Sequence, residues 1–145
     1  MKYFKCGNCQ KPYKIDENKV ENSNVIIQCI SCHAKNSVRF GPVLVLQSKY
    51  GVKQFALKLG ENTIGRKTDS SNLDIEIEDE FISRAHASIF IHEKDSKLYA
   101  FICDNNSLNA TFNQRKTPLK PGLKYPMTSK DYYIIGLTKL SLKFN

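Results

Sequence analysis

The sequence predicts an all-β protein in two parts, a small N-terminal unit followed by a larger β-sandwich. Beyond residue 41, segments of strand length recur about every 8–12 residues, separated by clusters of Gly, Asn, Asp, Ser and Pro. Four of the five cysteines fall within the first 32 residues, which sets that region apart. No stretch of ten or more residues shows helical periodicity, so both parts are expected to be built from strands.

The early cysteines form two pairs, Cys6-Gly-Asn-Cys9 and Cys29-Ile-Ser-Cys32, with 19 residues between them. Each C-x-x-C turn can direct two thiolates to a point about 2.3 Å away, and two such turns complete a tetrahedron. Four thiolates leave no open coordination position, so the spacing predicts one structural Zn²⁺ held by Cys6, Cys9, Cys29 and Cys32. Residues 1–40 are too few to fold on an apolar core alone. They resemble a small zinc ribbon.

Two alternatives remain open for these cysteines: a pair of disulfides, or His33 in place of Cys32 as the fourth ligand. Residues 1–9 are polar and contain a cysteine pair, which is not typical of a secretory signal. We therefore expect a cytoplasmic protein, in which thiols stay reduced. Cys103 lies in an apolar segment and is interpreted as a small hydrophobic residue of a strand.

Phe40-Gly41-Pro42 predicts the boundary between a domain of residues 1–40 and one of residues 41–145. A short apolar run comes first, followed by a segment in which Phe55, Leu57 and Leu59 share one face, and then by strict alternation with Leu73, Ile75 and Ile77 pointing inward. Later segments continue this pattern. The expected strands are Val43–Gln47, Gln54–Leu59, Leu73–Ile77, Ala87–His92, Leu98–Cys103, Tyr132–Ile135 and Lys139–Phe144.

Three segments expected to be loops of the sandwich contain unusual polar residues. These are Asn62-Thr63-Ile64-Gly65-Arg66, Ile82-Ser83-Arg84-Ala85-His86, and Asp104 to Thr111 with Ser107-Leu108-Asn109-Ala110-Thr111 at its end. Gly-Arg, then Ser-x-x-His, then an Asn-containing turn, in this order between short strands, resembles a forkhead-associated (FHA) domain over roughly residues 43–145. The resemblance implies a β-sandwich of about eleven strands that binds phosphothreonine peptides on the loops at one end and has no catalytic activity.

Each site residue takes its expected role from this resemblance. Arg66 and Ser83 would hold the phosphate, Asn109 would bond the ligand backbone, and Arg84 would face the peptide or support its loop. Gly65 would allow the close approach of strand and loop, and His86 would support the Ser83 loop from beneath. A guanidinium is a permanently charged fork that suits a phosphate with about −1.5 to −2 charge.

The third loop departs from the usual family turn, Ser-Thr-Asn-Gly-Thr. Leu108 stands where a hydroxyl residue often bonds the ligand, and one lost charge-assisted bond costs about 1.5–3 kcal/mol. Weaker or altered binding is therefore expected at this turn, and Lys67 partly compensates by adding charge beside Arg66. Ala110 stands where the family has Gly, which matters only if that position requires a positive φ.

The net charge of +8 is spread over both parts: residues 1–40 carry 7 basic and 3 acidic side chains, and residues 41–145 carry 15 and 11. This charge favours an acidic partner but does not choose its kind. The resemblance implies a phosphothreonine-containing protein or peptide as the partner, and no small-molecule substrate is expected. No apolar run has the roughly 18 residues of a membrane span. A nucleic acid bound by the lysine-rich zinc unit is the less favoured alternative, and a phospho-independent scaffold is another. No catalytic pair of residues is found, so an enzyme is not expected.

Overall fold

The structure is a computed structural model that describes residues 2–16, 24–39, 41–95 and 97–144. The described residues contain fourteen strands and no helix, which confirms the all-β prediction. Among them, no helix is long and apolar enough to cross a membrane. Phe40, the first residue of the predicted boundary, lies outside the described residues.

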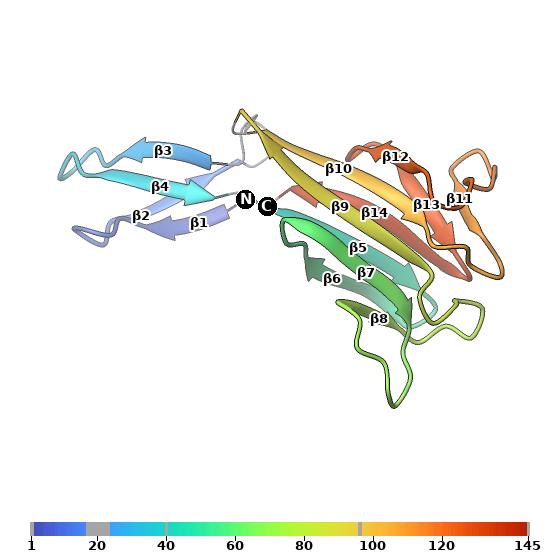
Figure 1. Cartoon of the computed structure of the whole chain (residues 1–145). Helices are drawn as coiled ribbons and strands as arrows, with labels where there is room; N and C mark the ends of the chain where they lie inside the picture. The colour runs from blue at the N-terminus through green and yellow to red at the C-terminus, as the bar shows by residue number, and fades with distance from the viewer. Residues whose placement is uncertain (1, 17–23, 40, 96, 145) are drawn as a thin grey trace.

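Two hairpins make up the described N-terminal region, and they lie outside the two larger sheets (Figure 1). Strand β1 (Lys2–Lys5) pairs with β2 (Pro12–Ile15), and β3 (Asn24–Gln28) pairs with β4 (Lys35–Arg39). The inner side chains of the first hairpin include Phe4 and Tyr13, whose rings stack at 5.3 Å. Their neighbours along the strands, such as Tyr3, are exposed, so the alternation of each hairpin leaves one face covered and one open.

The chain beyond residue 41 forms two five-stranded sheets that pack face to face as a sandwich (Figure 1). One sheet has the order β12-β10-β9-β7-β8 and the other β11-β13-β14-β5-β6. The resemblance implied about eleven strands, and the described part of this region has ten. They are β5 (Pro42–Ser48), β6 (Gly51–Ala56), β7 (Gly60–Arg66), β8 (Ile75–Ile77), β9 (Ala87–Lys94), β10 (Lys97–Asp104), β11 (Thr111–Asn113), β12 (Lys124–Met127), β13 (Tyr132–Ile135) and β14 (Thr138–Phe144).

The core lies between the two sheets and consists of inward-facing aliphatic side chains, because alternate residues of each strand point to the same face. Leu44 and Leu140 come from one sheet, and Ile64, Ile89 and Ile102 come from the other, and all five are fully buried. The core fixes the strands rigidly, and the connections at one end of the sandwich are positioned by the strands from which they emerge.

Three sequence-based expectations were wrong. The segment from Asn62 to Arg66 is not a loop but most of β7. The strand expected over Gln54–Leu59 ends at Ala56, and the one expected over Leu73–Ile77 begins only at Ile75. Asn62 suggested a turn, but its side chain is buried: Nδ2 donates to the Ile89 carbonyl at 3.1 Å, and Oδ1 accepts from the Lys58 amide at 3.0 Å. The Asn62 side chain therefore closes the turn before β7 and is buried at the same time.

Candidate functional site

Three segments meet at the end of the sandwich where β7 ends. The backbone N–H of Arg66 donates to the Ser83 carbonyl at 3.0 Å, which joins the end of β7 to the β8–β9 connection. The Leu108 N–H donates to Ser83 Oγ at 3.0 Å, which joins the β10–β11 connection to the same serine. Ser83 is therefore the residue at which all three segments converge. Ser83 Oγ accepts the Leu108 N–H and donates to no other group of the described residues, so its hydroxyl proton can be donated to a ligand.

Gly65 makes the contact between β7 and the β8–β9 connection possible. A Cβ atom at this position would lie 2.0 Å from the Arg84 carbonyl oxygen and 2.6 Å from Leu73 Cδ1. Backbone cannot move away as a flexible side chain can, so only glycine allows this approach. The glycine therefore sets the distance between Arg66 and the Ser83 segment.

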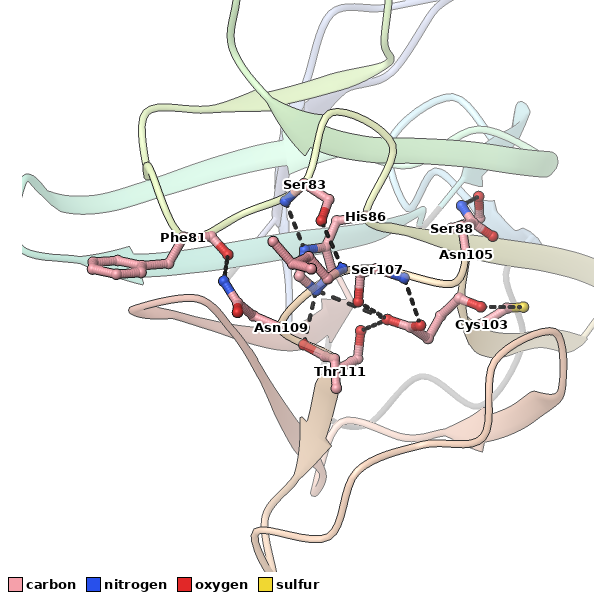
Figure 2. Close-up of polar contacts among 12 residues, drawn as sticks. Phe81, Ser83, His86, Ser88, Cys103, Asn105, Ser107, Asn109 and Thr111 are labelled. Atoms are coloured by element: carbon pink, nitrogen blue, oxygen red, sulfur yellow. Dashed lines mark hydrogen bonds and ion pairs between the residues drawn. The ribbon is translucent and has the colours of Figure 1, made fainter.

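His86 lies fully buried beneath the Ser83 segment and bridges two of the three segments (Figure 2). Its Nδ1 accepts the Ser83 N–H at 3.0 Å, so the ring proton belongs to Nε2, which donates to the Ala110 carbonyl at 2.9 Å. Burial lowers the pKa of His86 below its ordinary value, although the Ala110 bond and the Asp104 charge oppose this shift. The neutral imidazole is the form that can make both bonds.

The turn that carries Asn109 is held by a buried carboxylate, Asp104. Asp104 Oδ1 accepts the hydroxyl protons of Ser107 at 2.5 Å and Thr111 at 2.7 Å, and Oδ2 accepts the Ser107 N–H at 3.1 Å. In Figure 2 the Asn109 side chain points to Phe81, whose carbonyl accepts from Asn109 Nδ2 at 2.9 Å. The carbonyl oxygen of the Asn109 amide remains able to accept a further hydrogen bond.

Ala110 has a φ of +64°. The position where the family has Gly therefore does require a positive φ. An L-residue is disfavoured in this left-handed conformation by about 1–2 kcal/mol. The turn keeps this shape because the Ala110 carbonyl is bonded to His86 and Thr111 is anchored by Asp104.

The cationic side chains around Ser83 differ in their surroundings. The half-buried Arg66 side chain has no ion-pair partner among the described residues. Lys67 Nζ lies 3.6 Å from Glu78 Oε1, and both side chains are largely exposed, so this pair is weak. Arg84 is exposed on the same connection as Ser83. Arg66 joins the junction through its backbone N–H, and its side chain is a permanently charged guanidinium, which is suited to an anion.

A hollow of about 210 Å³ lies beside the β8–β9 connection. Its apolar walls are Tyr50, Phe81 and Leu137, all exposed. Its charged lining includes the acidic residues Glu78 and Glu80 and the basic residue Lys49. The Phe81 carbonyl is the group that holds Asn109. The hollow and the Asn109 turn are therefore adjacent.

The structure brings Arg66, Ser83, His86, Leu108 and Asn109 together through the contacts described above, although they come from different segments. Sequence reasoning did not single out Asp104 or Asp79. Asp79 Oδ2 accepts the Leu137 N–H at 2.7 Å and the Thr138 hydroxyl at 2.9 Å, which fixes the start of the β8–β9 connection. Asp104 precedes Asn-Asn-Ser, which is a typical turn-forming sequence. Asp79 Oδ1 also accepts the Phe81 N–H at 2.9 Å, which is a local contact. Its partners Leu137 and Thr138 are almost sixty residues away in the sequence, so no local signal could have revealed those two bonds.

The second group of interest is formed by the four early cysteines. Their sulfur atoms all lie within 4.8 Å of one another, and the Cys6–Cys32 and Cys9–Cys29 separations are both 3.6 Å. Four sulfurs about 2.3 Å from one metal ion at tetrahedral angles would be about 3.8 Å apart. The arrangement therefore fits a four-thiolate metal site. All five cysteines are free, and the alternative ligand His33 is not part of the cluster.

A hydrogen bond from the Tyr13 hydroxyl lowers the pKa of Cys29 to about 5. The same bond raises the pKa of Tyr13, as expected when the phenol is the donor. Cys29 is thus favoured as a thiolate at neutral pH, which is the form that binds metals.

The FHA domain family model matches residues 62–136, which are 75 of the 145 residues. No curated protein sequence matches the chain. Among solved structures, full-length yeast Pml1p is 21% identical, with a TM-score of 0.65 over 74% of this chain and 83% of that one. The FhaA FHA domain, solved with the intracellular domain of Rv3910, is 24% identical, with a TM-score of 0.56 over 70% and 99% of the two chains.

A third similar structure is the MEK1 FHA domain in complex with a HOP1 phosphothreonine peptide. It is 19% identical to this chain, with a TM-score of 0.57 over 70% of this chain and 96% of that one. At these identities the structural matches establish a shared fold.

Proposed function

The chain belongs to the FHA domain family, and from this premise we propose that it is a non-catalytic adaptor that binds phosphothreonine-containing proteins in signalling. FHA domains are binding modules, and no enzyme family matches the chain. The observation that carries the proposal is the junction at Ser83, whose carbonyl accepts the Arg66 N–H and whose hydroxyl oxygen accepts the Leu108 N–H. The phosphothreonine peptide in the MEK1 complex is consistent with this ligand class.

The chemistry of the junction supports a phosphate ligand. A phosphothreonine carries about −1.5 to −2 charge and three acceptor oxygens. Arg66 offers two parallel N–H donors, Ser83 offers its hydroxyl proton, and Lys67 and Arg84 add positive potential. Asn109 is held by the Phe81 carbonyl through its amide nitrogen, so its amide oxygen can accept an N–H of the peptide backbone. Gly65 and His86 support this arrangement without contacting the ligand.

Leu108 makes the proposed site weaker than one with a hydroxyl residue in its place. Its N–H supports Ser83, but its side chain is 90% exposed and offers no donor. A threonine there could add one bond to the phosphate or the peptide, with a gain of about 1.5–3 kcal/mol if the bond is charge-assisted. Leu108→Thr should therefore raise the affinity for a phosphothreonine peptide by about tenfold or more.

The hollow beside Asn109 would select residues that flank the phosphothreonine. Phe81, Tyr50 and Leu137 would contact the aliphatic part of a side chain, and Glu78 and Glu80 would attract a positive end. An arginine or lysine combines both properties, because its stem is apolar and its head charged. We therefore expect peptides with a basic residue near the phosphothreonine to bind better than peptides with an acidic one there.

Titration of a phosphothreonine peptide library, with its unphosphorylated counterpart, tests the proposal. Wild type should prefer the phosphorylated peptides, and Arg66→Ala should lose at least about tenfold in affinity, as expected for a charge-assisted bond. Arg115→Ala is the matched control, because it removes the same charge from an exposed loop between β11 and β12. Equal binding by wild type and Arg66→Ala, or equal binding of both peptide sets, would contradict the proposal.

We further propose that residues 1–40 form a unit separate from residues 41–145 and hold one structural Zn²⁺ through Cys6, Cys9, Cys29 and Cys32. The four sulfurs have the spacing that the ion requires, and such a small unit needs the metal for its stability. Reduced thiols are consistent with the cytoplasmic location that we propose. Native mass spectrometry should show one zinc ion per chain, which is lost in Cys29→Ser. A metal-free wild-type chain would overturn this assignment.

A further inference from the structure

The two hairpins of the N-terminal unit have equivalent backbones around their cysteine pairs. In the first, the Gln10 N–H donates to the Cys6 carbonyl at 2.9 Å, and the Cys6 N–H donates to the Lys11 carbonyl at 2.9 Å. In the second, the His33 N–H donates to the Cys29 carbonyl at 2.9 Å, and the Cys29 N–H donates to the Ala34 carbonyl at 2.8 Å. The residue after each cysteine pair has a positive φ, +66° for Gln10 and +63° for His33. The two cysteine pairs therefore lie in turns of the same backbone conformation, and each of these turns is called a knuckle below.

Seven residues after the first cysteine of each knuckle, a side chain reaches across to the other knuckle. In the first hairpin this residue is Tyr13, whose hydroxyl donates to Cys29 Sγ at 3.0 Å and accepts the Ile30 N–H at 2.9 Å. In the second hairpin it is Asn36, whose Oδ1 accepts the Gly7 N–H at 2.9 Å, while Nδ2 lies 3.5 Å from Cys6 Sγ. Each side chain contacts one sulfur and one backbone amide of the opposite hairpin.

We propose that Tyr13 and Asn36 are positioning residues of the four-cysteine centre, acting as a reciprocal clasp that sets the sulfur tetrahedron. This proposal rests on the metal site proposed above. Strands β1 and β2 form one sheet, and β3 and β4 form another, so no strand pairing joins the two described hairpins. The clasp supplies hydrogen bonds between them at the sulfurs themselves. Partners of this kind orient the ligands of a metal and change its affinity.

The two halves of the clasp are not equal. The 3.0 Å contact of Tyr13 is a short bond from a hydroxyl to a sulfur, and the tyrosine ring is also stacked on Phe4 at 5.3 Å. The 3.5 Å contact from Asn36 Nδ2 is longer, so the stronger part of this residue's contribution is its bond to the Gly7 amide. Tyr13 therefore acts mainly on a ligand atom, and Asn36 acts mainly on the backbone of the knuckle.

Metal titration of the full-length chain separates these roles. Tyr13→Phe removes only the hydroxyl and keeps the stacked ring. Asn36→Ala removes the acceptor for Gly7 together with the amide donor, which also contacts the Ala34 and Ile27 carbonyls of its own hairpin at 3.3 and 3.5 Å. The matched controls are Tyr3→Phe and Asn8→Ala, whose side chains are exposed. The readouts are Zn²⁺ affinity by competition with a chelator and the thiolate-to-metal charge-transfer band after loading with Co²⁺.

Tyr13→Phe should lower Zn²⁺ affinity by about 10–100-fold, the usual effect of losing a partner of a metal ligand. It should also shift the Co²⁺ charge-transfer band to lower energy, because a thiolate without its hydrogen bond is more easily oxidised. Asn36→Ala should also lower the affinity but shift the band less than Tyr13→Phe does, because its shorter bond is to the Gly7 amide and not to a sulfur. Both controls should match wild type. If wild type binds metal but Tyr13→Phe has the affinity and spectrum of Tyr3→Phe, the clasp is overturned while the metal site stands. If wild type binds neither Zn²⁺ nor Co²⁺, both are overturned.

Discussion

Replacing Ala110 with glycine should stabilise the protein, although a mutation to glycine usually destabilises. Ala110 has a φ of +64°, and the left-handed conformation costs an alanine about 1–2 kcal/mol. Glycine removes this strain but has a more flexible unfolded state, which offsets about 0.4–1 kcal/mol. The net gain in the free energy of unfolding should be about 0.5–1 kcal/mol.

Urea denaturation measures this difference directly, and a thermal melt should show a rise of about 2–8 °C for a domain of about 100 residues. Ala85→Gly is the matched control: Ala85 is exposed on the β8–β9 connection and is not among the residues with a positive φ. It should be neutral or destabilising. Affinity for a phosphothreonine peptide should stay the same or rise in Ala110→Gly, because the Asn109 turn is then held without strain. A destabilised Ala110→Gly variant would refute the reasoning.

Three further predictions concern the junction. Gly65→Ala should destabilise the protein by about 2 kcal/mol or more in urea denaturation, because the new Cβ would overlap the Arg84 carbonyl oxygen; wild-type stability would contradict the close approach. Ser83→Ala should weaken phosphopeptide binding by about tenfold or more in a titration, with little change in the melting temperature because the bond from Leu108 is exposed. Because the pKa of His86 is lowered in the folded state, the unfolded chain takes up a proton first as the pH falls. The contribution of neutral His86 to the free energy of unfolding should therefore be complete above about pH 6.5 and be lost as the pH falls through the folded-state pKa. His86→Gln should lack this part of the pH dependence in urea denaturation.

The sequence predicted the strands whose alternation is strong. Ile75 and Ile77 are buried with half-buried Glu76 between them, and the segment Tyr132–Ile135 is a strand with those bounds. These strands face a core on one side and solvent on the other, so their pattern of residues has a period of two. The convergence of the two cysteine pairs was also predictable, because C-x-x-C spacing constrains the thiolates locally.

Strand β7 could not be recognised, because Asn62 and Gly65 are residues typical of turns. Both are in the strand for reasons that depend on distant parts of the chain. Asn62 bonds the carbonyl of Ile89, and Gly65 leaves room for the carbonyl of Arg84. The bonds of Asp79 to Leu137 and Thr138 and the contacts of the Tyr13–Asn36 clasp are equally non-local. Local patterns therefore predict where strands lie, while the residues that hold the loops in place depend on tertiary contacts.

The central claim is that the end of β7 and the connections containing Ser83 and Asn109 form one phosphothreonine site. The most direct test is an NMR titration of the ¹⁵N-labelled chain with a phosphothreonine peptide and with its unphosphorylated twin. The phosphorylated peptide should shift the amide signals of Arg66, Ser83 and Leu108 and leave those of the four-cysteine unit unchanged, and its twin should shift none of them. Shifts confined to the four-cysteine unit, or the same shifts with both peptides, would contradict the claim.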